Sequence, residues 1–477
     1  MNQPAHFSLS TLVLAFCVLH GTLQGASQER ANILVLIADD LGIDRVRAYG
    51  YRNQTGNLIA PKTPNIDQLA AQGVLFRNAW AAPACSPARA SSLTGLYPNR
   101  TGMGAAIGSG GSGEMGLRDD ISTVADLLPK GYKNALLGKW HIAGSDARTG
   151  GNDHAPRCGF DEHSGTFGNL EQEKESGSNR GYFSWEWLKS LALDLAATEV
   201  TRVEDEYVTS HTTNAALRHI EDFGDAPWFL WVAYHAPHKP YHVPPKDLIQ
   251  STDLDLSSEL GQGKAMVEAL DTEIGRLLAG IKPEVRARTT ILFFGDNGTQ
   301  RALVEAPFPL KRAKGTIYNG GIHVPLIISG PQTPTAKRGS ECNALVDITD
   351  LRPTIEEICA STSEIPADGT SLLPYLADPA LASRRKWIYA ERFKPNFIPE
   401  SGKTIASIPL TLHHQAVRGA RYKLVRRWDS RGESLEFYDL QTDYFETKSL
   451  LDAKGEPSAE RRKTFNALLK VLREMAE

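Results

Sequence analysis

The stretch Asn32-Ile-Leu-Val-Leu-Ile-Ala-Asp-Asp-Leu-Gly42 decides the fold of this 477-residue chain. After Asn32 it runs through six apolar residues, which is typical of a strand buried on both faces of a parallel sheet. The strand ends directly in Asp39 and Asp40. Ligands of open α/β sheets bind beyond the carboxyl ends of the strands, so these two carboxylates are candidate site residues.

Three later segments have the same pattern, and two of them also end in polar side chains. Parallel strands present their carboxyl ends at one edge of a sheet, so polar residues that are far apart in the sequence are expected to converge there. The segments are residues 228–234, followed by His235 and His238; residues 290–294, followed by Asp296 and Asn297; and residues 324–329.

Helical segments are expected between these strands. They are residues 63–72, with Thr63 as the cap and Pro64 at the first helical position, residues 209–223, and residues 264–281. Alternating strands and helices predict an α/β fold with a large, mostly parallel sheet flanked by helices.

The pattern changes after about residue 380. The segments that follow favour an antiparallel, hairpin-like sheet and a charged amphipathic helix at the end of the chain. The strands are expected at residues 386–390, 416–427 and 433–438, and the helix at residues 458–477. We therefore expect a main domain at residues 27–380 and a smaller C-terminal α+β domain at residues 381–477.

The first residues are typical of a cleaved export signal. Residues 12–19 form an uninterrupted apolar run, and the small residues Gly25 and Ala26 follow. The run is too short to span a bilayer, and no later stretch resembles a membrane helix. We expect residues 1–26 to be a signal peptide, the mature protein to be secreted or periplasmic, and no integral membrane segment to be present.

The net charge and the cysteine content argue against three classes of protein: those that bind nucleic acid, those that bind anionic membranes, and disulfide scaffolds. The net charge is -4, so no basic excess points to nucleic acid or to an anionic membrane. Cys17 would leave with the signal, and four cysteines remain, too few in a chain of this length for a disulfide scaffold. The sequence leaves open whether Cys342 and Cys359 form a disulfide bridge.

One of these cysteines opens the segment Cys85-Ser-Pro-Ala-Arg-Ala-Ser-Ser-Leu-Thr-Gly95. The segment predicts a short helix with Ser86 as its N-cap, Pro87 at the first helical position and Gly95 at its end. Free N–H groups and the helix dipole favour an anion at such an entrance. On spacing alone, a cysteine that merely packs in the core is the commoner alternative.

The same segment resembles the signature of the sulfatase family, Cys-x-Pro-x-Arg followed by Ala-Ser and Leu-Thr-Gly. In that family the cysteine is oxidised after translation to formylglycine (3-oxoalanine), an aldehyde. The resemblance implies that Cys85 is modified in this way by a formylglycine-generating maturation enzyme. Ala88 stands where many family members have serine, which leaves open the kind of maturation machinery.

The resemblance extends from about residue 32 to the end of the chain and implies an alkaline-phosphatase-like fold, with the catalytic domain at residues 27–380. The resemblance depends on the order of the matching motifs and on how much of the chain they cover, more than on any single motif. Besides the first strand and the Cys85 segment, the matching elements are Gly138-Lys-Trp-His141, Ala236-Pro-His-Lys-Pro240, Gly295-Asp-Asn-Gly298, Lys314-Gly315, Gly320-Gly321, Val324-Pro325, Asp368-Gly-Thr-Ser-Leu-Leu373 and Phe437-Tyr-Asp-Leu440.

A divalent metal is implied beside Cys85. Asp39, Asp40, Asp296 and Asn297 offer only oxygen donors, which suit calcium or magnesium rather than zinc. Each pair alone would be typical of a solvated turn. The resemblance implies that these four residues and residue 85 hold the metal, with calcium the commoner ion in the family and magnesium the alternative.

The resemblance also implies a catalytic set: Cys85, Arg89, Lys139, His141, His238 and Lys314. The two lysines would hold the sulfuryl oxygens, and the arginine would brace the nucleophile and the carboxylates. The two histidines would transfer protons, because the charge of histidine changes near neutral pH. His235 and His242 are expected to be structural or to line an access channel. His323 stands where the family often has arginine, at a structural position.

The function implied is hydrolysis of aryl or carbohydrate sulfate esters. The hydrated aldehyde would attack sulfur, His238 would protonate the leaving alcohol, and His141 would deprotonate the second hydroxyl to expel sulfate. One alternative is a phosphonate or phosphate ester hydrolase of the same superfamily. Another is a non-catalytic protein that binds sulfated glycans.

Two features near the middle of the chain bear on the substrate. Residues 144–179 are rich in Gly, Ser, Asn and charge, and we expect long surface loops there. Tyr182, Trp185 and Trp187 follow this segment. They either stack on a sugar or belong to the core.

Overall fold

The first strand of the sequence lies in the middle of the main sheet. The computed structural model describes residues 30–108, 115–145, 149–170, 180–399 and 405–476, and Ala31–Glu477 form one compact unit. The expected signal peptide, residues 1–26, lies outside the described residues. Among the helices of the described residues, none is long and apolar enough to cross a membrane.

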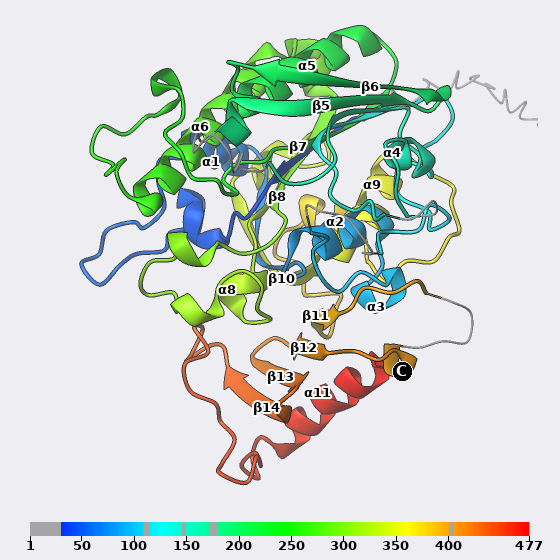
Figure 1. Cartoon of the computed structure of the whole chain (residues 1–477). Coiled ribbons are helices and arrows are strands. Elements are labelled where there is room, and N and C mark those ends of the chain that lie inside the picture. The colour runs from blue at the N-terminus through cyan, green and yellow to red at the C-terminus, as the bar shows by residue number, and fades with distance from the viewer. Residues whose placement is uncertain (1–29, 109–114, 146–148, 171–179, 400–404, 477) are drawn as a thin grey trace, which may run out of the picture. The chain divides into compact units, whose positions relative to one another are not determined.

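The main sheet has ten strands in the order β10-β2-β9-β8-β1-β7-β3-β4-β5-β6 (Figure 1). Five neighbouring pairs are parallel and four are antiparallel, so the expected α/β sheet is confirmed, with antiparallel strands near both edges. The strands are β1 (Asn32–Ala38), β2 (Val74–Trp80), β3 (Lys133–Lys139), β4 (Glu162–Thr166), β5 (Ser184–Leu191), β6 (Asp194–Glu204), β7 (Trp228–Ala233), β8 (Thr289–Gly295), β9 (Leu326–Ser329) and β10 (Ser340–Asp347).

The register of the central strands brings the polar strand ends together. β1 pairs in parallel with β7 on one side and with β8 on the other. Ile37 lies opposite Ala233, and Ala38 lies opposite Gly295. The residues that follow these three strands therefore emerge at the same edge of the sheet, as predicted from their sequence pattern.

Both faces of β1 are buried, because helices cover both sides of the sheet. Leu34 and Leu36 belong to the hydrophobic cluster of α1, α5 and α6, whereas Val35 and Ile37 belong to that of α2 and α9. The helices are α1 (Pro64–Ala71), α2 (Cys85–Thr94), α3 (Pro98–Thr101), α4 (His154–Arg157), α5 (Val208–Phe223), α6 (Glu259–Gly280), α7 (Pro283–Ala287), α8 (Asn319–Ile322), α9 (Leu351–Ile358), α10 (Leu373–Ala377) and α11 (Arg462–Glu474).

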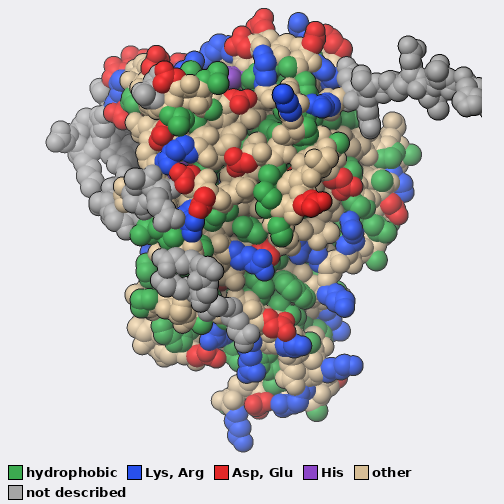
Figure 2. Space-filling view, turned by 90° about the vertical axis from the view of Figure 1, so that its right-hand side faces the viewer, with side chains coloured by type: hydrophobic (Ala, Val, Ile, Leu, Met, Phe, Trp, Pro, Cys, Tyr) green, Lys and Arg blue, Asp and Glu red, His purple; other side chains and the backbone are tan. Residues whose placement is uncertain are grey.

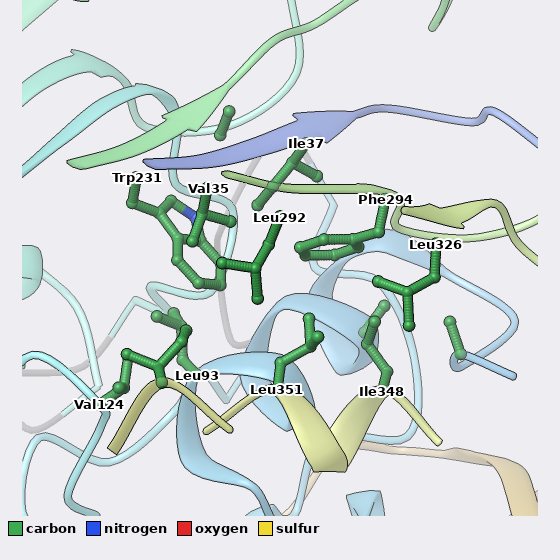
Figure 3. Close-up of a cluster of buried hydrophobic side chains, with 14 of the residues drawn as sticks. Val35, Ile37, Leu93, Val124, Trp231, Leu292, Phe294, Leu326, Ile348 and Leu351 are labelled. Atoms are coloured by element: carbon green, nitrogen blue, oxygen red, sulfur yellow. The ribbon is translucent and has the colours of Figure 1, made fainter. Parts of the chain in front are cut away.

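Figure 3 shows the second of these clusters, in which strand side chains point toward the helices. Trp231 of β7 and Phe294 of β8 lie on the sheet side, and Leu93 of α2 and Leu351 of α9 lie on the helix side. All four are at most 1% exposed. Burial of a side chain of this size stabilises the fold by about 1.5–3 kcal/mol, so this layer anchors α2, the helix that carries Cys85.

The C-terminal region contains the expected antiparallel sheet, in the order β11-β12-β13-β14. The prediction of a single strand at residues 416–427 is wrong, because the chain turns back at Gly419, whose N–H donates to Tyr422 O at 3.0 Å. Phe465 and Leu472 of α11 pack against this sheet. The strands, orange in Figure 1, are β11 (Ile388–Lys394), β12 (Leu412–Arg418), β13 (Tyr422–Asp429) and β14 (Gly432–Asp439).

The expected helices are present, with shifted starts. α6 begins at Glu259 rather than at residue 264, because the Ser258 Oγ accepts a hydrogen bond from Gly261 N–H at 3.1 Å and caps the helix. Thr63 lies at the N-cap position of α1, but its side chain makes no capping bond there. Its Oγ1 instead donates to Asp67 Oδ1 at 3.1 Å.

The expectation of surface loops over residues 144–179 is wrong for much of the part that the structure describes. This segment contains α4 and β4, and His154 and His163 are buried in it. The His154 ring accepts a hydrogen bond from Trp140 Nε1 at 2.9 Å, so a polar residue is satisfied inside the core. Residues 146–148 and 171–179 lie outside the described residues.

The sequence left undecided the pairing of two cysteines and the role of the aromatic residues near position 185, and all of these side chains are buried. Cys342 and Cys359 are buried thiols that do not form a disulfide bridge. Trp185 and Trp187 pack edge-on against His211 of α5, with ring centroids 5.5 and 4.6 Å apart. Trp187 therefore belongs to the core, and Trp185 packs there while it also lines the cavity beside His141.

Candidate active site

Cys85 is the first residue of α2, not a residue ahead of it. The prediction that Ser86 caps this helix is wrong: Ala84 holds the N-cap position, in an extended conformation, and its side chain makes no capping bond. The Ser86 Oγ instead accepts a hydrogen bond from Ile107 N–H at 3.0 Å. Gly95 ends the helix as predicted, in the left-handed region with φ of 66°.

The Cys85 thiol lies among charged groups of two other segments. Its Sγ is 3.3 Å from Asp39 Oδ1, 3.8 Å from Asp40 Oδ1 and 3.2 Å from Lys314 Nζ. Burial and the charge of Asp39 raise the pKa of this thiol far above its ordinary value. An unmodified cysteine here therefore remains a neutral thiol and is a poor nucleophile.

Three fully buried carboxylates surround the thiol, and each has a cationic partner. Asp39 is ion-paired with Lys139, and Asp40 with Lys314. Asp296 accepts from Arg89 Nε at 3.1 Å and from Arg89 Nη2 at 2.9 Å. The sequence-predicted carboxylates and cations are thus brought together from five segments.

These contacts shift the carboxylate pKa values in opposite directions. Burial alone would raise the pKa of Asp39, but Lys139, His238, Arg89 and Lys314 together hold it well below its usual range. The pKa of Asp296 is raised to about 6, by burial and then by the negative charge of Asp39. The cluster thus balances three carboxylates against three cationic side chains and places several oxygen donors at the edge of the sheet.

The donor set fits a hard divalent cation. Ligand atoms of Asp39, Asp40, Cys85 and His238 lie within 4.8 Å of one another. Among the described residues, Asp40 Oδ2 and Asn297 Oδ1 are buried without a hydrogen-bond partner. Buried oxygens without a donor are costly unless an ion or water satisfies them, so these two atoms point to a bound cation.

Backbone geometry at the site is unusual at two of its residues. Asp40 has φ of 68° and His141 has φ of 60°, in a region that non-glycine residues rarely adopt. Gly138 precedes Lys139 with φ of 87°, and a Cβ there would lie 2.2 Å from Ala233 O. The Gly-Lys-Trp-His motif therefore requires glycine at this position.

Neighbouring carbonyls determine which nitrogen of each histidine faces the site. His238 Nδ1 lies 2.7 Å from Lys239 O and donates to it, which leaves Nε2 facing Asp40 Oδ2 at 3.8 Å. His141 Nε2 donates to Ile107 O at 2.9 Å. Its Nδ1 is therefore an acceptor, and it is buried without a partner among the described residues.

Burial keeps both of these histidines neutral near pH 7. It lowers the pKa of His238 to about 4 against the opposing charges of Asp40 and Asp39. Burial and the positive charge of Lys139 hold the pKa of His141 well below its ordinary value.

Three further residues of the site were not predicted in these roles. Tyr182 OH lies 2.8 Å from His235 O and 2.7 Å from His238 O, where it positions the loop that follows β7. Thr166 Oγ1 lies 2.7 Å from His235 Nε2. Ile107 links Ser86 to His141 through its backbone. Nothing in the sequence around Tyr182 separates this role from ordinary core packing.

The remaining histidines have structural partners, as expected. His323 Nε2 lies 2.8 Å from Arg77 O, and its Nδ1 lies 2.8 Å from Tyr444 OH. His242 Nδ1 lies 2.9 Å from Pro240 O. The buried position of each ring agrees with a role in packing.

A cavity of about 390 Å³ lies beside His141. Its polar lining includes Thr166, Asn169, and Glu186 and Arg202 of the β5–β6 hairpin. The volume falls within the range of ligand sites in proteins. On the molecular face shown in Figure 2, acidic and basic side chains are interspersed.

Comparisons with known proteins agree with this geometry. A family model described as Sulfatase matches residues 31–358, and one described as N-sulphoglucosamine sulphohydrolase, C-terminal, matches residues 312–474. The chain is 29% identical over 385 residues to N-acetylgalactosamine-6-sulfatase of Homo sapiens, covering 75% of this chain and 68% of that protein.

Two solved structures share the fold. One is the PsFucS1 sulfatase from Pseudoalteromonas sp., with a TM-score of 0.68, 22% identity and coverage of 94% of this chain and 91% of that one. The other is BT4656 in complex with its substrate D-glucosamine-2-N,6-O-disulfate, with a TM-score of 0.67, 21% identity and coverage of 94% and 97%. The matched family model spans most of the described sequence, and on that ground this chain belongs to the sulfatase family and is a sulfuric ester hydrolase.

Proposed function

We propose that this chain hydrolyses sulfate esters of carbohydrates with a formylglycine nucleophile made from Cys85. The observation that carries the proposal is the position of the Cys85 Sγ, 3.3 Å from Asp39 Oδ1 and 3.2 Å from Lys314 Nζ. A nucleophile made at this position lies between a carboxylate cluster and an ammonium group, where an anionic ester would bind.

Asp39, Asp40, Asp296 and Asn297, with residue 85, would hold a calcium ion, or a magnesium ion as the alternative. When bound, the ion supplies positive charge to the sulfuryl oxygens and to the attacking oxygen. The hydrated aldehyde of formylglycine supplies two hydroxyls, one to attack sulfur and one to allow release of sulfate.

Lys139, Lys314 and Arg89 supply the protein's own positive charge. The pKa of Lys314 is raised well above its ordinary value, because Asp40 and Cys85 outweigh the effect of burial, so this side chain stays an ammonium group. Arg89 Nη1 also donates to Lys139 O at 2.8 Å and thereby positions the start of the Lys139 side chain. The two lysines bind the sulfuryl oxygens, and Arg89 positions the carboxylates.

The two histidines move the protons. His238 presents Nε2 to the site, held in that orientation by Lys239 O. This nitrogen carries no proton in the neutral ring, so His238 would first take up a proton there and then donate it to the departing alcohol. His141 presents an unpartnered Nδ1, the ring atom able to accept a proton from the second hydroxyl. All of these residues belong to the proposed catalytic domain, residues 27–380.

The remaining proposals concern maturation, export and substrate. A formylglycine-generating enzyme would act on Cys85, and the signal at residues 1–26 would direct the chain to the periplasm or outside the cell. A sulfated carbohydrate is supported by the relatives, one an N-acetylgalactosamine-6-sulfatase and one bound to a glucosamine disulfate.

The test combines two measurements on protein from the native host. Mass spectrometry of the peptide that contains Cys85 is expected to show the aldehyde in place of the thiol. Rates on matched sulfate and phosphate esters are expected to favour sulfate. A faster reaction with the phosphate ester would instead support the phosphate hydrolase, and binding without turnover of any ester would support the glycan-binding alternative.

A further inference from the structure

Lys314 belongs to a turn that holds its side chain against the nucleophile position. Its Nζ lies 3.2 Å from Cys85 Sγ. The backbone N–H of Lys314 donates to Thr299 O at 3.0 Å, and the next N–H along the chain, that of Gly315, donates to Pro83 O at 2.8 Å. The conformation of this turn therefore determines where the ammonium group lies.

The glycine in this turn does not fix its conformation. Gly315 has φ of 84°, in the left-handed region, and among the described residues nothing lies within 4 Å of the place that a Cβ would take. Glycine has more conformational freedom than any other residue, so hydrogen bonds must hold the turn. One of them comes from far along the chain, because the Gly315 carbonyl accepts from Arg392 Nη1.

The C-terminal sheet brings this guanidinium to the turn. Arg392 lies on β11, two residues beyond Ala390. Side chains two residues apart on a strand project to the same face, so Arg392 shares the face of Ala390. Ala390 packs in one hydrophobic cluster with Ile317 and Tyr318. The face that carries Arg392 thus also packs against the segment that directly follows Lys314.

The charge of Arg392 is not balanced by an acid. Among the residues that the structure describes, its guanidinium has no ion-pair partner, and its hydrogen bond goes to the Gly315 carbonyl. Burial lowers the pKa of this guanidinium, and no carboxylate of the described residues opposes the effect. A partly buried cation without a counter-charge costs free energy, so Arg392 is better explained by the group that it holds. A charged donor makes a strong hydrogen bond and can fix a carbonyl in place.

We propose that Arg392 is a positioning residue that holds Lys314 beside residue 85 through the Gly315 carbonyl. The inference rests on the proposed function, in which Lys314 binds the sulfuryl oxygens of the substrate. The proposed catalytic and metal-binding side chains all precede β11 in the sequence. The C-terminal sheet therefore contributes to the reaction without a side chain that touches the substrate.

The first experiment measures kcat and KM on an aryl sulfate. Arg392→Gln is expected to lower kcat/KM about tenfold, the effect of losing one charged hydrogen bond. Arg392→Lys keeps a charged donor and is expected to recover part of this loss. Thermal unfolding establishes that each assayed variant is folded. A folded Arg392→Gln variant whose kcat/KM stays within about twofold of the native value would overturn the proposal.

Arg426→Gln is the matched control. Arg426 lies on β13 of the same sheet and is 25% exposed, but it contacts Glu433 and Gln415 rather than the turn of Lys314. This variant removes the same charge and is expected to keep kcat/KM within about twofold of the native value. Equal losses in Arg392→Gln and Arg426→Gln would show an effect of the whole sheet and would contradict a specific role of Arg392.

A double-mutant cycle tests whether Arg392 acts through Lys314. The Kd of an aryl sulfate is measured by calorimetry in the inactive Cys85→Ala background. Arg392→Gln alone is expected to weaken binding about tenfold. With Lys314→Ala already present, it is expected to add less than about twofold, because a residue that acts through another has no effect once that residue is removed.

The cycle also separates this inference from the proposed function. If Lys314→Ala weakens binding and Arg392→Gln multiplies that loss in full, Lys314 keeps its role in the proposed function and the positioning role of Arg392 is refuted. If Lys314→Ala leaves the Kd unchanged, the proposed role of Lys314 is wrong, and the inference about Arg392 falls with it.

Discussion

Arg89 holds Asp296 by two hydrogen bonds to a single carboxylate oxygen, from Nε at 3.1 Å and from Nη2 at 2.9 Å. The other oxygen of Asp296 accepts from Asp40 N–H at 3.0 Å. The carboxylate is thus fixed between α2 and the end of β1 before any metal binds. Groups that orient metal ligands in this way contribute to affinity although they do not touch the ion.

Arg89→Lys is therefore expected to weaken metal binding by about 10–100-fold, because lysine keeps the charge but cannot make both hydrogen bonds. Calcium titration by calorimetry measures this change. Arg431→Lys is a suitable control, since Arg431 is 78% exposed and lies outside the site. Unchanged affinity in Arg89→Lys would contradict the positioning role.

Asp296→Ala is expected to lose the metal and the activity together, since it removes a proposed ligand and leaves Arg89 buried without its carboxylate. Metal content by elemental analysis and turnover of an aryl sulfate measure the two losses. Thorough chelation of the native enzyme should abolish turnover, and added calcium should restore it. Full activity after chelation would refute the metal role.

Cys85→Ser is expected to react at most once with a sulfate ester. Serine offers a hydroxyl for the attack but lacks the second hydroxyl needed to release sulfate. Intact mass spectrometry after incubation with an aryl sulfate should show one added sulfuryl group and no continued product formation. Sustained multiple turnover by this variant is incompatible with the formylglycine mechanism.

Lys423→Met is expected to lower the free energy of unfolding by about 3–5 kcal/mol, because it leaves Glu446 buried without a counter-charge. In the native chain Lys423 Nζ lies 2.6 Å from Glu446 Oε1, and both side chains are at most 1% exposed. Denaturant unfolding measures the loss. Adding Glu446→Gln to this variant should recover much of it, and an equally unstable double variant would argue against the ion pair as the cause.

Asp347→Asn is expected to stabilise the fold relative to the native chain as the pH rises. Burial raises the pKa of Asp347 to about 7, against the effect of Arg385. A carboxyl with a raised pKa binds its proton more tightly in the folded state, so native stability falls between about pH 4 and pH 7. Asparagine cannot ionise, so the variant lacks this fall.

The difference in unfolding free energy between the Asp347→Asn variant and the native chain should grow by about 2–4 kcal/mol from pH 4 to pH 8. Thermal unfolding at these pH values measures it. A difference that does not change with pH would show that the Asp347 carboxyl is not perturbed.

Local sequence was sufficient to predict the central strands and the residues that follow them. Residues 33–38 are apolar without alternation, and the strand that they form is buried on both faces. The start of α2 was predicted less well. Ser86 has the chemistry of a cap, but its hydroxyl is engaged by Ile107 N–H, a contact over 21 residues that no local pattern indicates.

The polar segment at residues 144–179 was predicted incorrectly for a similar reason. Its composition favours loops, yet His154 is buried because Trp140 and Leu117 O satisfy both of its ring nitrogens. No sequence pattern marks Glu186 and Arg202 as cavity-lining residues, because charged residues on a hairpin usually face solvent. Their shared wall became visible only from the register of β5 and β6.

The sequence by itself determined the chemistry of this protein: buried strands that end in carboxylates, and a cysteine signature with its lysines and histidines in family order. Only the tertiary structure decided which nitrogen of His141 is free, which oxygens lack partners, and which side chains line the cavity beside it. The physical reason is that hydrogen-bond roles and charge proximity depend on distances between atoms of segments far apart in the chain, such as Ile107 O and His141 Nε2.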